Sequence, residues 1–388
     1  MRRVGIGLGL ATGIIVLMGY ALSVSSYGRT IGLLLRAARV DTPVLRPIAG
    51  WQTSTITETE RTLPSRRGIL RARVYTPATV RTRPLLLVSG VHALGIDEPR
   101  VRHLATEIAR AGTMVVTPDL PDLQEYLVTG RLTDDIEDAA IALASEQTAS
   151  SAAGSDTRIG LLGVSFSGGL AIIASGRPSL RDRVAFVFSF GGHASLARVV
   201  HYLASGQHPD GDVPPPHDYG GVVLLMNVAP ALVPGPQVAA LRAGVARFLH
   251  ASHLDMFDKP QAAREFEAAI ALEADLPEPA RQVMHLVNTR NTVELGRMIL
   301  PHLATMSADP SLSPETSEAP SAPVFLLHAD GDTVIPTREA HLLQASLESR
   351  GATVRLFTTT LLDHAEVKRT PRVGELIAMV RFWAEMPW

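Results

Sequence analysis

The sequence predicts an α/β protein with a mostly parallel sheet that helices cover on both faces. Short, continuous apolar runs recur along the 388-residue chain, as expected for strands that are buried on both faces. Helical patterns such as residues 101–112 and 134–147 separate these runs, which favours parallel connections. Hydrophobic residues make up 46% and charged residues 19% of the chain, so it can bury a large core. The predicted strands are residues 85–88, 114–118, 159–164, 184–190, 324–328 and 354–359.

Along the sequence, two additional strands precede the predicted parallel strands, and a long segment without strands separates the last two of them from the rest. Residues 56–62 and 69–76 are predicted as two strands, the second with alternating apolar and arginine residues and therefore one solvent-facing side. Over residues 204–322 the strand pattern stops and helical patterns replace it. We therefore expect one core, formed by residues 54–203 and 323–388, that carries a mainly helical insertion.

Two features of the composition exclude whole classes of function. Thirty-six basic and thirty-eight acidic residues nearly cancel, so no bulk positive charge favours a nucleic acid as partner. The chain has no cysteine, which excludes disulfides, thiolate metal sites, iron–sulfur clusters and cysteine nucleophiles. A small-molecule substrate is therefore the expected partner.

Residues 1–30 are predicted to be a signal peptide or an N-terminal membrane anchor. Arg2 and Arg3 precede an uncharged apolar run over residues 4–24, and a spanning helix needs about 20 apolar residues. Small residues at 21–23 also offer a signal-peptidase site, so a cleaved signal stays open. Both alternatives predict an exported or membrane-anchored protein, with its body on the periplasmic or extracytoplasmic side. A third alternative is an apolar helix that packs on the soluble body.

The strongest local signal for chemistry is the motif GVSFSGG at residues 163–169, between a predicted strand and a helical run. A serine on a sharp strand-to-helix turn needs small residues two positions away on each side, because those positions pack against neighbouring strands. Gly163 and Ser167 are small, although the usual motif has glycine at the second position. A glycine-rich turn can instead bind a phosphate, but no GKS, GKT or GxGxxG motif is present. Ser165 is therefore a candidate nucleophile.

Two later segments supply a candidate acid and a candidate base. HADGDTVIP at residues 328–336 follows a predicted strand and contains Asp330 and Asp332. A carboxylate there can orient a histidine, although the two aspartates can also form a turn and cap the next helix. His364 follows the next predicted strand, and histidine is the natural base for a serine near neutral pH. Serine, acid and histidine thus occur in the chain order of the α/β-hydrolase triad.

With these motifs the sequence resembles the α/β-hydrolase superfamily, and within it the dienelactone-hydrolase and acyl-esterase side. GVSFSGG is similar to the family's GxSxGG, HADGDTVIP to its HGxxDxVVP, and DHA stands where the family has its catalytic histidine. The resemblance implies an α/β-hydrolase fold with Ser165 as nucleophile, Asp332 as acid and His364 as base. Spacing to Pro336 favours Asp332 over the runner-up acid, Asp330.

The same resemblance implies an oxyanion hole made of two backbone N–H groups. One belongs to Phe166, directly after the nucleophile, and the matched second donor is Val91 in the loop after residues 85–88. His92 and His193 are candidates for the pocket wall, but neither stands where the family has its base.

The insertion lies where these hydrolases carry a cap over the site. It contains His217 and Asp218, which are candidates for reaching the substrate, and an apolar stretch over residues 221–235. That stretch is too short and too interrupted by proline to span a bilayer. It is either the buried core of a helical cap, which we favour, or an acyl-binding or membrane-facing lid.

Together these residues predict a serine hydrolase that cleaves carboxylic esters through an acyl-enzyme. Its expected partners are a small-molecule or lipid-like ester and, through the N-terminal segment, a membrane. No metal or organic cofactor is needed for this chemistry. A thioesterase or a peptidase would use the same triad, and a non-catalytic, membrane-tethered module of the same fold is the alternative from another class. The complete trio of side chains favours the enzyme.

Overall fold

The computed structural model describes residues 25–40, 42–363, 366–367 and 373–388. The apolar run of the predicted signal peptide or anchor, up to residue 24, and the predicted base His364 lie outside these residues. Within the described ranges, no helix is both long and apolar enough to cross a membrane.

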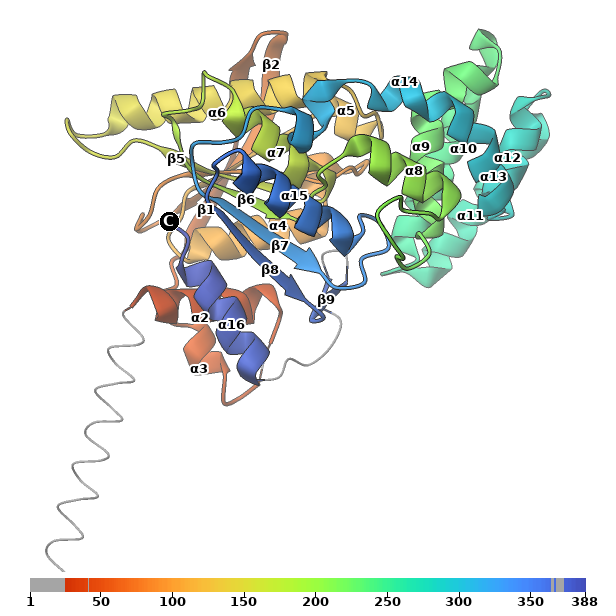
Figure 1. The fold of residues 1–388 in the computed structure, drawn as a ribbon. Coiled ribbons are helices and arrows are strands. Elements are labelled where there is room, and N and C mark those ends of the chain that lie inside the picture. Colours follow the sequence, from red (N-terminus) through yellow and green to blue (C-terminus); the bar gives the residue numbers. More distant parts are fainter. Residues whose placement is uncertain (1–24, 41, 364–365, 368–372) are drawn as a thin grey trace, which may run out of the picture.

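A sheet of eight strands forms the centre of the described part of the chain (Figure 1), in the order β1-β2-β4-β3-β5-β6-β7-β8. β2 runs antiparallel to both of its neighbours, and all other neighbouring strands pair in parallel. The predicted mostly parallel sheet and the extra pair of strands in front of it are confirmed. The strands are β1 (Ile56–Ser65), β2 (Gly68–Pro77), β3 (Leu85–Val88), β4 (Val115–Pro118), β5 (Ile159–Val164), β6 (Val184–Phe190), β7 (Val324–Ala329) and β8 (Val354–Thr359).

The buried strands present alternate side chains to two separate hydrophobic layers, because successive residues of a strand point to opposite faces. Leu86 and Val88 of β3 belong to one layer, which α6, α7 and α15 cover. Leu85 and Leu87 belong to the other layer, which α4 and α16 cover. Helices therefore lie on both faces of the sheet, as the continuous apolar runs predicted. These helices are α4 (Pro99–Arg110), α6 (Arg131–Ser150), α7 (Phe166–Gly176), α15 (Thr337–Ser349) and α16 (Val373–Ala384).

Helix α2 (Ser26–Ala37) belongs to the body of the protein and packs beside α16 and α4 (Figure 1). Its buried Leu33 joins the hydrophobic layer under α16. Arg36 of α2 donates from Nε to Glu107 of α4 at 2.6 Å. Sequence patterns predict the core only from residue 54 onward, so α2 is an addition to it. Three short helices complete this part: α3 (Arg46–Ala49), α5 (Pro121–Gln124) and the 3-10 helix η1 (Gly95–Asp97).

The chain between β6 and β7 is helical and contributes no strand to the sheet. Its most apolar helix, α9, is largely buried, with Val222, Leu225 and Ala229 at most 3% exposed. The apolar stretch in the insertion thus forms much of the core of this helical layer, which we call the cap. Its helices are α8 (Leu196–Ser205), α9 (Asp218–Leu232), α10 (Gly235–Leu254), α11 (Lys259–Asp275), α12 (Ala280–Asn288), α13 (Thr292–Ile299) and α14 (Leu303–Ser307), followed by the 3-10 helices η2 (Leu300–His302), η3 (Pro310–Leu312) and η4 (Pro314–Thr316) in the returning segment.

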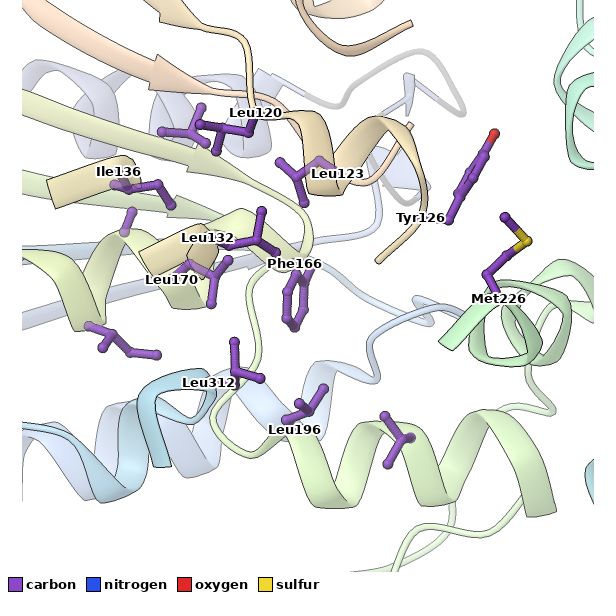
Figure 2. Packing of buried hydrophobic residues seen from close by; sticks show 14 of the residues in the cluster. Leu120, Leu123, Tyr126, Leu132, Ile136, Phe166, Leu170, Leu196, Met226 and Leu312 are labelled. Atoms are coloured by element: carbon purple, nitrogen blue, oxygen red, sulfur yellow. The ribbon is translucent and has the colours of Figure 1, made fainter. Parts of the chain in front are cut away.

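Figure 2 shows how the cap meets the core at the start of α7. The ring of Phe166 lies among Leu132 of α6, Leu196 of α8 and Leu312 of η3, and all four side chains belong to one buried cluster. The first turn of α7 is therefore fixed by apolar contacts from both the core and the cap.

A buried ion pair also joins the cap to the core. Glu339 of α15 is fully buried and accepts hydrogen bonds from the backbone N–H groups of Ala194 and Ser195, both at 2.8 Å. Arg198 of α8 donates from Nε to the same carboxylate at 2.6 Å, and His208 lies 3.1 Å from it. Burial alone would raise the pKa of Glu339, but the hydrogen bond and charge of Arg198 outweigh it and hold this pKa below its usual value.

Replacing Arg198 by alanine should lower the free energy of unfolding by about 3–5 kcal/mol, because it leaves a buried carboxylate without its cation. Arg181→Ala is the matched control, since its partner Glu318 lies 3.4 Å away and both side chains are more than half exposed. That change should cost less than about 1 kcal/mol. Urea unfolding of both variants measures the difference, and equal losses would contradict the assignment of this pair as a structural link.

Candidate active site

Ser165 lies at a sharp turn between β5 and α7, at the carboxyl end of a central strand. Its backbone has φ 56° and ψ −133°, a conformation that costs a non-glycine residue about 1–3 kcal/mol. The Ser165 N–H donates to the carbonyl of Phe190 at 2.6 Å, and its own carbonyl accepts from the Gly168 N–H at 2.8 Å. The turn is therefore held from the neighbouring strand β6 and from the helix that follows.

The small residues around Ser165 are required by close backbone contacts. A Cβ atom on Gly163 would lie 2.1 Å from the carbonyl oxygen of Ser167, so no larger residue fits there. Ser167, which replaces the usual glycine, is fully buried and donates from Oγ to the carbonyl of Ser89 at 2.6 Å. This departure from the motif thus ties the turn to the loop after β3.

The loop after β3 runs beside the Ser165 side chain. A Cβ atom on Gly90 would lie 3.2 Å from the Cβ of Ser165. The next residue, Val91, donates no backbone hydrogen bond within the described part of the chain. The N–H of Phe166 is the first of α7 and therefore has no carbonyl partner in its own helix. Two main-chain N–H groups are thus available in the loop and at the helix start that flank Ser165.

The two candidate acids have opposite environments. Asp332 is 1% exposed, whereas Asp330 is exposed to solvent. Asp332 Oδ1 accepts from the backbone N–H groups of Val334 and Ile335 at 2.8 and 3.0 Å. These two bonds fix the carboxylate just after β7.

Asp332 also lies close to the loop after β6 and to the cap. A Cβ atom on Gly191, next to the Phe190 carbonyl that holds Ser165, would lie 3.9 Å from Asp332 Oδ2. Burial and then the charge of Asp332 raise the pKa of the Tyr202 hydroxyl above its usual value. Tyr202 donates to the carbonyl of Thr333 at 3.2 Å, and so connects α8 to the loop that contains Asp332. No sequence pattern pointed to Tyr202.

His364 cannot be placed, because it lies outside the described residues. The short strands on either side of it, β9 (Leu362–Asp363) and β10 (Glu366–Val367), pair in antiparallel fashion. Leu362 lines the same cavity as Ser165. The segment just before the predicted base therefore borders the site.

A cavity of about 1490 Å³ opens at Ser165, which exceeds the roughly 300–1,000 Å³ of common small-molecule pockets. Its walls come from the loop after β3, from the cap helices α9 and α10, and from α2 and α16. His217 and Asp218, at the start of α9, line the cap side as expected from the sequence. The lining is mainly apolar.

His92 and His193 have different surroundings. His92 lines the cavity, with its ring centroid 4.2 Å from that of His253 of α10. Burial and the neighbouring His253 lower the pKa of His92 to about 4, so its ring is neutral at pH 7. His193 does not line the cavity: it is fully buried and stacks on Phe166, with the ring centroids 4.7 Å apart. His193 thus packs against the first residue of α7 and lies in the protein interior.

Strand order and site position together decide the fold class. The serine stands at the turn after β5, the candidate acid follows β7, and the cap leaves the sheet between β6 and β7. A nucleophile elbow at the end of a mostly parallel sheet, with the acid after a later strand, is characteristic of one superfamily. The chain has the α/β-hydrolase fold. The predicted fold is thereby confirmed.

Comparisons with solved structures return α/β-hydrolases at low sequence identity. An esterase from Pyrobaculum calidifontis is 16% identical, with a TM-score of 0.46 over 93% of this chain and 90% of that chain. A thermophilic carboxylesterase cloned from a metagenomic library is 16% identical, with a TM-score of 0.46 over 87% and 91%. The acylaminoacyl peptidase of Pyrococcus horikoshii is 14% identical, with a TM-score of 0.45 over 83% of this chain, which spans only 40% of that peptidase. No family model and no curated protein sequence matches the chain.

Proposed function

We propose that the protein is a serine hydrolase that cleaves carboxylic esters. The observation that carries the proposal is the position of Ser165, on a strained turn that lines a large cavity and is flanked by two available backbone N–H groups. Strain of this kind persists only where the surrounding structure imposes it, and it concentrates at functional sites.

In the proposed reaction His364 takes the proton from Ser165 Oγ as this oxygen attacks the ester carbonyl. The N–H groups of Phe166 and Val91 stabilise the negative oxygen of the tetrahedral intermediate. The C–O bond to the alcohol then breaks, His364 returns the proton to the leaving alcohol, and an acyl-enzyme remains. Water, deprotonated by His364, then attacks the acyl carbonyl. The bond to Ser165 Oγ breaks, His364 returns the proton to this oxygen, and the acid is released.

Asp332 is proposed to orient His364 and to stabilise its positive charge. The burial of Asp332 and the two N–H donors on its Oδ1 support this role, because they hold the carboxylate in one orientation. The exposed Asp330 lacks such support. A thioester or an amide substrate would use the same groups.

Labelling with a fluorophosphonate tests the proposal, because this reagent reacts with activated serines. The full-length protein should take up one label, and mass spectrometry should place it on Ser165. Ser167→Ala is the sharpest control, since Ser167 is the nearest other hydroxyl in the motif and donates to Ser89. That variant should still be labelled. A protein that stays unlabelled would instead be a binding module of this fold.

We further propose that residues 1–30 export the protein or anchor it in a membrane, with the body on the extracytoplasmic side. The support is the sequence alone: two arginines precede an uncharged apolar run of the length that a bilayer requires. Cell fractionation and sequencing of the mature N-terminus test this. A soluble cytoplasmic protein with an intact first residue would contradict it.

A further inference from the structure

The cavity at Ser165 has two sides that differ in polarity. The side under the cap and along the loop after β3 combines apolar side chains of the cap helices with ionisable groups, among them His92, His217, Asp218 and Arg290. The opposite side, between α2 and α16, is walled by aliphatic side chains. These are Ile31 and Leu34 of α2 and Leu376, Met379 and Val380 of α16. We call this second side the α2–α16 arm.

The arginines that line this arm are solvent-exposed. Arg39, just beyond α2, and Arg381 of α16 are both exposed to solvent. Tyr27 of α2 and Ile377 of α16 also line the cavity and remain 45% and 49% exposed. The lining side chains of α2 and α16 that are not exposed are therefore apolar, Trp383 among them, while His103 of α4 adds one polar ring beside α2.

The arm is continuous with the site of Ser165. Leu33 of α2 and Met379 of α16 belong to the same hydrophobic cluster as the last residues of two strands, Val164 and Phe190, which pack against it. Val164 precedes Ser165, and the carbonyl of Phe190 holds the Ser165 N–H. Ser165 and residues of α2 and α16 also line one cavity, so a chain attached to Ser165 can extend into the arm.

We propose that the α2–α16 arm binds the fatty acyl chain of the substrate, so that the substrate class is a long-chain acyl ester. This inference rests on the proposed function of Ser165. Each methylene group that the arm buries strengthens binding of the acyl chain by about 0.8 kcal/mol. An apolar arm is therefore selective for the length of this chain. The side under the cap, which carries ionisable groups as well as apolar ones, suits the alcohol part of the ester, which leaves first. A short acyl group would leave most of the arm unfilled.

Chain-length selectivity of blocked variants tests the arm. The probes are p-nitrophenyl butanoate and p-nitrophenyl dodecanoate, assayed on the full-length protein below micelle-forming concentrations. The wild type should prefer dodecanoate in kcat/KM. Val380→Trp narrows the arm from α16, and Leu34→Trp narrows it from the facing helix α2. In each variant the dodecanoate-to-butanoate ratio of kcat/KM should fall by about tenfold or more, which corresponds to fewer than two buried methylene groups.

Ile69→Trp is the matched control, because Ile69 is 72% exposed on β2 and does not line the cavity. Its ratio should equal that of the wild type. A wild type that prefers butanoate, or an unchanged ratio in both blocked variants, would overturn the inference. The two blocked variants lie on different helices, so the test still works if one of them does not fold.

Binding to an inactive protein separates this inference from the proposed function. Calorimetry with dodecanoic acid on Ser165→Ala should show binding that Val380→Trp in the same background weakens about tenfold or more. If the wild type hydrolyses esters but Ser165→Ala does not bind dodecanoic acid, the arm fails and the proposed function stands. If no ester is hydrolysed but the acid binds in this Val380-dependent manner, the proposed function fails and the arm stands as a binding site.

Discussion

Replacing Ser165 by alanine is expected to lower the rate of ester hydrolysis by a factor of about 10⁴–10⁶. The substitution removes the attacking oxygen and leaves the N–H groups of Phe166 and Val91 in place. The turn should persist, because its bond to the Phe190 carbonyl comes from the backbone of residue 165. Hydrolysis of p-nitrophenyl butanoate measures the loss, and circular dichroism checks the fold.

Ser175→Ala is the matched control for this loss. Ser175 is a buried serine in α7, and its Oγ donates to the Ile172 carbonyl within the same helix. That variant should keep most of its activity. If Ser165→Ala retained more than a few percent of the wild-type rate, the nucleophile would have to be another residue.

Asp332→Asn is expected to lower the rate by about 10⁴, because an amide at this position favours the wrong tautomer of the catalytic histidine. The amide oxygen can still accept the N–H groups of Val334 and Ile335, so the loop should keep its shape. Asp330→Asn, two residues earlier on the exposed side of the loop, should change the rate little. Both variants are compared on one activated ester. Equal losses would place the acid elsewhere.

The strands were predictable because their local sequences are distinctive. Residues 159–164, 184–190 and 354–359 were predicted as strands and coincide with β5, β6 and β8. In the first two, almost every side chain is buried, so the run is apolar apart from Ser189. The turn at Ser165 was predictable for a similar reason, since a Cβ on Gly163 has no room.

Other parts of the site depend on contacts between distant residues, which leave no local pattern. The bond from Ser167 to the Ser89 carbonyl joins residues 78 positions apart, and the link from Tyr202 to Thr333 spans 131. The docking of α2 on α16 joins the two ends of the described chain. The roles of Ser165, Asp332, Val91 and Phe166 stay predictions, as does that of His364.

The cap leaves the sheet after Phe190 of β6 and returns at Val324 of β7, and these two strands are hydrogen-bonded neighbours. Because these strands are parallel, the cap leaves at the carboxyl end of β6 and returns at the amino end of β7. The closure entropy of such a connection grows only slowly with its length. Helices of the cap can be lost, gained or exchanged without a shift in the register of either strand. The proposed pocket for the alcohol and the turn at Ser165 can thus diverge at different rates in the descendants of this protein.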